Sequence, residues 1–124
     1  MKIENILLSI LTLVLSLIAL GWIVSPESSA NSIDMILLDG KGRNTQVRDF
    51  TALFLGTSIM SLLSFITRQY QWVLSAGIIF SIMIVMSFIS SFYHDSLISY
   101  QSLAAEIIFA TMAISSALLL KFKN

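Results

Sequence analysis

Five residues of types that can carry charges, protons or ligands stand out in a largely apolar sequence. His94 and Asp95 are adjacent in the stretch YHDSLISY, and Glu106 lies inside the last apolar run. Arg48 and Asp49 open the second apolar run. A carboxylate in hydrocarbon is costly, so such a residue usually faces the interior of a bundle, pairs with another charge or marks a functional pathway.

The preferred partner for Glu106 is Arg48. A guanidinium group can hold a carboxylate through two parallel hydrogen bonds, which suits a shallow, partly desolvated position. Asp49 is then left to point to water or to favour the positive N-terminal end of its helix. Two roles stay open for the pair: a structural clasp between the second and fourth helices, or a site for a ligand or a proton.

His94 and Asp95 are expected in a solvated turn, with Asp95 capping the next segment, and proton or ligand handling is the alternative. A metal site built from His94, Asp95 and Glu106 has suitable ligand types but lacks the recurring histidine spacing of known sites. The chain has no cysteine and a single histidine, so neither a metal nor another cofactor is predicted.

The elements that position these residues are membrane spans. The 124 residues are 56% hydrophobic and only 11% charged, with a mean hydropathy of +0.89, whereas about a quarter of the residues of a soluble domain are charged. A transmembrane helix needs about 20 mostly apolar residues. The runs predict helices at about 6–24, 47–67, 72–92 and 102–120, in a single domain over 1–124. The fold class predicted is an all-α membrane protein with four transmembrane helices in an antiparallel up-down bundle.

The connections differ in length. Ser25 and Pro26 should stop the first helix, because proline lacks the N–H that a continuing helix needs. A long loop, 25–46, follows, and its apolar island 33–38 is too short to span and is predicted to lie over the bundle mouth as a re-entrant or interfacial piece. The short connection TRQYQW predicts a tight antiparallel hairpin of the second and third helices.

Because consecutive transmembrane helices run in opposite directions, all five candidate residues are expected at one membrane face. Small residues share the helical stripe of each charge, which predicts that both stripes face inward. The stripes are Glu106, Ala110, Ala113 and Ala117 in the fourth helix, and Arg48, Ala52 and Gly56 in the second.

Charge composition restricts the partners. Seven Lys and Arg balance seven Asp and Glu, so neither nucleic-acid binding nor an anionic-lipid patch is expected. The expected partners are the lipid bilayer and either another membrane protein or further copies of this chain. Basic residues slightly favour the side of the termini, which predicts cytoplasmic termini; they are Lys2, Arg68, Lys121 and Lys123, against Lys41, Arg43 and Arg48.

The order of these features is similar to that of a known family. A Ser-Pro follows the first span, Arg48 opens the second ahead of Ala52 and Gly56, Asp95 lies in the last loop, and Glu106 lies early in the fourth span. In this order the chain resembles a domain-of-unknown-function family of small bacterial four-helix integral membrane proteins. The resemblance covers nearly the full length and implies a four-helix antiparallel fold in the bacterial inner membrane, without an established activity.

Three classes of function are compatible with these residues. The first is a non-catalytic membrane protein, either an accessory or scaffold subunit or a binder of a small lipophilic ligand. The second is a dimeric, proton-coupled small transporter. The third is a lipid-directed acid–base enzyme such as an isomerase, with Glu106, His94 or Asp95 as proton carriers.

Overall fold

The computed structural model describes residues 2–123, which form helices and no strands. The helices are α1 (Ile3–Val24), α2 (Pro26–Ser32), α3 (Gly40–Thr67), α4 (Tyr70–His94) and α5 (Tyr100–Lys123). Four of them, α1, α3, α4 and α5, are long and apolar enough to cross a membrane. The predicted fold class, an all-α membrane protein with four spans in an up-down bundle, is confirmed.

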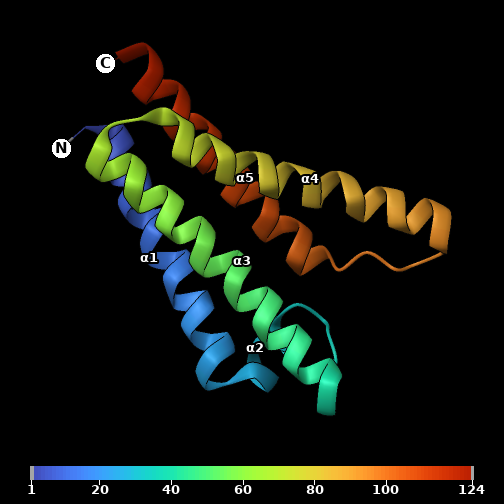
Figure 1. Ribbon diagram of the computed structural model, residues 1–124. Helices are drawn as coiled ribbons and strands as arrows, with labels where there is room; N and C mark the ends of the chain where they lie inside the picture. The colour runs from blue at the N-terminus through green and yellow to red at the C-terminus, as the bar shows by residue number, and fades with distance from the viewer. Residues whose placement is uncertain (1, 124) are drawn as a thin grey trace.

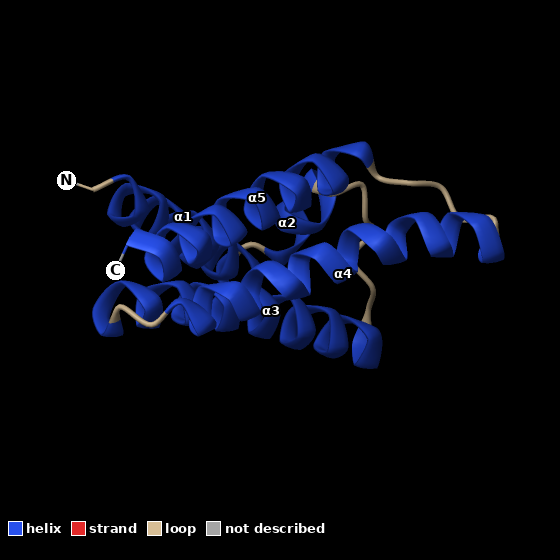
Figure 2. Cartoon of the chain, turned by 90° about the horizontal axis from the view of Figure 1, so that it is seen from above, coloured by secondary structure: helices blue, strands red, loops and turns tan. Residues whose placement is uncertain are grey.

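The bundle consists of two helix pairs (Figure 1). α1 packs along α3, and α4 packs along α5, while α1 also contacts α5 and α3 also contacts α4. The two pairs meet at the end of the molecule that carries both termini and diverge toward the other end. Seen from above, the last turns of α4 extend beyond the other helices (Figure 2).

The contact between α1 and α3 joins leucines to hydroxyls. α1 buries Leu8, Leu11 and Leu15 on one face, and α3 buries Thr57, Ser58, Ser61 and Ser64. The Ser61 hydroxyl donates to the Leu8 carbonyl at 3.2 Å, and the Ser58 hydroxyl donates to the Thr12 carbonyl at 3.0 Å. Small residues allow transmembrane helices to approach closely, and their hydroxyls can bond across the interface.

The contact between α4 and α5 depends on residues with little or no side chain. A Cβ added at Gly77 would lie 2.9 Å from Ile114 Cγ1 and 3.3 Å from Ala113 Cβ. Ala110, Ala113 and Ala117 of α5 are all buried. The two helices therefore approach closely where Gly77 faces α5.

The predicted loop 25–46 is wrong for most of its length. α1 does end at Val24, but Pro26 starts the short helix α2 at once, because the first position of a helix does not need the N–H that proline lacks. α3 begins at Gly40, about two turns before the predicted start. Within 25–46, only Ser25 and the segment 33–39 are not helical. The segment 33–39 is bonded to α3, since Gln46 Oε1 accepts the Leu38 N–H at 2.7 Å and Arg43 Nε donates to the Leu38 carbonyl at 2.9 Å.

α3 and α4 form the predicted antiparallel hairpin around a very short turn. Arg68 adopts a left-handed conformation, with φ of 63°, directly after α3. The Ser64 hydroxyl donates to the Gln69 carbonyl at 2.7 Å and accepts the Val73 N–H at 2.8 Å. The hairpin is close only near this turn, since α3 then follows α1 and α4 follows α5 (Figure 1).

Candidate functional site

The expected ion pair between Arg48 and Glu106 is not formed. Arg48 Nε lies 2.9 Å from Oδ1 of its neighbour Asp49, and both side chains are largely exposed, at 65% and 60%. The stripe Arg48, Ala52 and Gly56 does not face the core, since Ala52 is exposed and a Cβ at Gly56 would meet no atom within 4 Å. α3 instead turns its hydroxyl face toward α1, and this register carries Arg48 away from α5.

Glu106 does face the interior, as predicted. Its stripe, with Ala110, Ala113 and Ala117, is buried, and Glu106 itself is only 7% exposed. The Ser102 hydroxyl donates to Glu106 Oε1 at 3.0 Å. Oε2 is buried and accepts no hydrogen bond from any residue in the described range 2–123. A buried carboxylate oxygen without a donor is unusual and requires an explanation.

Glu106 lines a cavity of about 640 Å³ where the two helix pairs diverge, which we call the wedge cavity. Its volume lies within the range of about 300–1,000 Å³ that is usual for small-molecule sites. The apolar lining is Ile18, Trp22, Ile33, Met35, Phe50, Phe54, Met83, Met86, Leu97, Ile98, Ala105 and Phe109. The polar lining is Ser29, Ser32, Ser87, Ser90, Ser96, Ser99, Gln101, Ser102 and Glu106.

Aromatic rings form part of the wall of the wedge cavity on both sides. Trp22 of α1 stacks on Phe50 of α3, with ring centroids 4.6 Å apart and an interplanar angle of 8°. On the other pair, Phe109 of α5 contacts Phe80 of α4 at a centroid distance of 5.3 Å. Trp22 is almost fully buried. The apolar lining of the cavity therefore combines aromatic rings from both helix pairs with aliphatic side chains.

Two loops meet beside the wedge cavity. The Ser99 hydroxyl, from the loop before α5, donates to Asp34 Oδ2, from the segment 33–39, at 2.9 Å. Ser99 also accepts the Ser102 N–H at 3.3 Å, so Ser99 caps α5. The prediction that Asp95 would cap this helix is wrong, because Asp95 follows α4 directly in a left-handed conformation, with φ of 53°.

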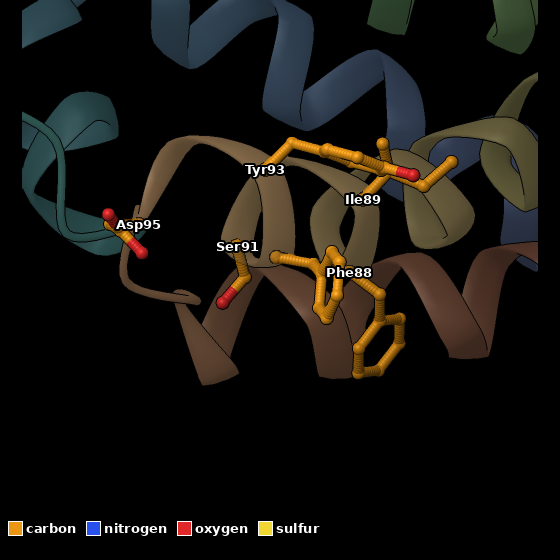
Figure 3. Close-up of a pocket in the computed structure, with 6 residues that line it drawn as sticks. Phe88, Ile89, Ser91, Tyr93 and Asp95 are labelled. Carbon is orange, nitrogen blue, oxygen red and sulfur yellow. The ribbon is translucent and has the colours of Figure 1, made fainter.

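His94 and Asp95 lie at the far end of α4, are both exposed, and do not line the wedge cavity. Asp95 instead borders an open hollow formed by the last turns of α4 alone (Figure 3). Its labelled side chains, Phe88, Ile89, Ser91 and Tyr93, point in different directions and do not converge on one point. Within residues 2–123, no three His, Asp or Glu side chains gather as a metal site would require.

The sequence reasoning missed a second buried carboxylate. Glu4, at the start of α1, is completely buried, and Arg68 Nη2 lies 3.6 Å from its Oε1. Arg68 Nη1 also donates to Asn5 Oδ1. Both residues belong to the end of the bundle that carries the termini. The alternation of helix directions would therefore have been sufficient to predict that Glu4 and Arg68 lie close together.

No family model matches the chain, and neither does a curated protein or a solved structure. The resemblance to the small bacterial four-helix family stays a prediction.

Proposed function

We propose that this membrane protein binds a small lipophilic molecule in the wedge cavity, with Glu106 as its polar anchor. The observation that carries the proposal is the cavity itself, with a largely apolar and aromatic lining and one buried carboxylate oxygen that has no donor. Ligand sites typically combine an apolar wall with a few polar groups that fix orientation. The bound molecule would supply the missing hydrogen bond to Oε2.

The lining favours binding over acid–base catalysis. Glu106 is the only charged residue among the described residues that line the wedge cavity. An isomerase of the kind considered from the sequence would move protons between groups within hydrogen-bond reach of the substrate. His94 and Asp95, the other proton carriers considered, lie outside the cavity.

The position of the cavity also favours binding over proton-coupled transport. Glu106 lies less than two turns from the start of α5, so it is shallow rather than central. The opposite end of the bundle is filled by the packed contacts of Leu8, Leu11 and Ser61. A transporter would have to open that packed end as well.

The proposal is tested by native mass spectrometry of the protein released from lipid nanodiscs. We expect wild-type protein to retain a small molecule at a fixed stoichiometry. Ala105→Phe, which fills the cavity from α5, should lose that mass, whereas Leu118→Phe, on the exposed side of the same helix, should keep it. A wild-type protein that carries no added molecule, and instead releases together with another membrane protein or further copies of itself, would contradict the proposal and favour the scaffold role.

We place the protein in the bacterial inner membrane with cytoplasmic termini. The four spans support a multi-pass membrane protein. The excess of basic residues on the terminal side supports the orientation.

A further inference from the structure

We infer that the ligand of the wedge cavity is a lipophilic amine that binds as an ammonium ion carrying at least one N–H. The inference rests on the proposed function and names the chemistry of its ligand. Three features of the site carry it: the carboxylate, the absence of a basic residue in the described lining, and the aromatic wall.

The carboxylate has a vacant hydrogen-bond position. Ser102 satisfies Oε1, while Oε2 is buried and unpartnered. A carboxylate can accept hydrogen bonds at both oxygens, and those from charged donors are shorter and stronger. A ligand with an N–H would satisfy Oε2 in a way that a hydrocarbon or a quaternary ammonium cannot.

No basic residue of the described lining balances the charge of Glu106. Arg43 and Arg48 belong to the end of α3 that borders the wedge cavity, but both are exposed. They pair with Asp39 and Asp49, respectively. Arg68 and Lys121 lie at the opposite end, beside Glu4 and over the Tyr70 ring. A buried charge is tolerated when it is paired, so the missing positive charge is expected from the ligand.

The wall suits the rest of such a molecule. Ring faces attract cations within about 6 Å of the centroid, and tryptophan does so best. Trp22, Phe50, Phe54 and Phe109 all line the wedge cavity with Glu106. An aromatic or alkyl body would pack against these rings while its ammonium group contacts the carboxylate.

The test compares two probes of nearly the same shape, 1-naphthylmethylammonium and 1-naphthalenemethanol, by calorimetric titration of the full chain in phosphatidylcholine nanodiscs. We expect the ammonium to bind about tenfold or more tightly than the alcohol, as a charge-assisted hydrogen bond would give. Glu106→Gln should abolish that preference, and Glu27→Gln, which removes an exposed acid in α2, should leave it unchanged. Both probes also partition into the lipid, which adds heat to each titration. The quantity compared is therefore the ratio of the affinities of the two probes, not the total heat.

The outcomes separate the inference from the proposed function. Equal binding of the two probes, or an ammonium preference that survives Glu106→Gln, would overturn the inference while the cavity remains a binding site. Binding of neither probe to wild-type protein would overturn both. The comparison on wild-type protein decides the matter even if the Glu106 variant does not fold.

The ammonium group could belong to a free amine or to an aminolipid headgroup. Repeating the titration in nanodiscs that contain phosphatidylethanolamine distinguishes these sources. Competition with the probe identifies the headgroup as the source of the ammonium, and unchanged probe affinity identifies a free amine.

Discussion

The two buried carboxylates among residues 2–123, Glu4 and Glu106, differ in what lies beside them. Glu4 accepts no hydrogen bond at either oxygen within residues 2–123 but has the guanidinium of Arg68 at 3.6 Å, whereas Glu106 accepts one hydrogen bond from Ser102 and has one unpartnered oxygen, with no basic residue in the described lining. An ion pair compensates part of the cost of burial, and a single neutral hydrogen bond compensates much less. At the scale of residues, we therefore expect the loss of Arg68 to destabilise the protein through Glu4, and the burial of Glu106 to lower its stability.

We expect Glu106→Leu to raise the stability of the ligand-free protein by about 1 kcal/mol or more, because it replaces an incompletely bonded carboxylate with an apolar group. The measurement is thermal or denaturant unfolding of the purified protein, with naphthylmethylammonium binding measured in parallel and expected to be lost. The matched control is Glu4→Leu, which should lower stability because it leaves Arg68 without its carboxylate. A destabilised Glu106→Leu protein would instead indicate a structural clasp.

Arg68→Gly should reduce the free energy of unfolding by about 2–3 kcal/mol, because it removes the guanidinium group that lies beside the buried Glu4. Glycine is chosen because Arg68 has a φ of 63°, a conformation that glycine adopts without strain. The measurement is unfolding by denaturant. Adding Glu4→Gln to this variant should recover part of the loss, and a double variant no more stable than Arg68→Gly alone would show that the pair contributes little.

At the scale of elements, glycines at two positions should respond in opposite ways. Gly77→Ala should destabilise the protein by about 1–3 kcal/mol, because its Cβ would overlap Ile114 at the contact of α4 and α5. Gly56→Ala has free space and should be neutral or stabilise by up to about 1 kcal/mol, since alanine favours the helix. Thermal unfolding of the two variants side by side checks this. Equal effects would mean that the close approach at Gly77 is not important.

The hydrogen bond between Asp34 and Ser99 connects the two loops beside the wedge cavity, so its loss should speed ligand release. Asp34 has a φ of 59°, which glycine and asparagine both tolerate. Asp34→Gly removes the acceptor, whereas Asp34→Asn keeps one. We expect the dissociation rate of 1-naphthylmethylammonium to rise several-fold in the first variant only; the same rate in both would mean that the bond does not restrict release.

Sequence patterns predicted the helices better than they predicted which faces meet. Long apolar runs and Pro26 are local signals, so the four spans and the end of α1 were confirmed. The inward face of α3 was predicted wrongly because α3 carries a second set of small residues, and these hydroxyl-bearing residues, such as Ser61 and Ser64, pack inward in place of Ala52 and Gly56. Leu55, Ile59 and Leu62 face outward while the hydroxyls pack against α1. The wedge cavity depends on the divergence of two pairs, which no single-helix pattern encodes.

At the scale of the whole molecule, the helix pairs meet at the end with the termini, the packed end, and diverge toward the other end (Figure 1). The wedge cavity lies at that other end, the hollow end. The chain has no cysteine, so single cysteines report orientation without background. We expect Lys41→Cys, at the hollow end, to react with a membrane-impermeant maleimide on intact cells. Gln71→Cys, at the packed end, should react only after the membrane is permeabilised. The reverse pattern would place the termini outside.

The pairing of the helices has a consequence for how this protein is made. α1 and α3 belong to the first part of the chain and α4 and α5 to the second, and Arg68 and Gln69 connect the two parts. Each pair can therefore insert and assemble as a unit during synthesis. The wedge cavity does not exist in either helix pair alone, because its wall comes from both. Newly inserted chains would therefore acquire the proposed binding site only when the two pairs come together, and a ligand present in the membrane at that moment would stabilise the assembled form.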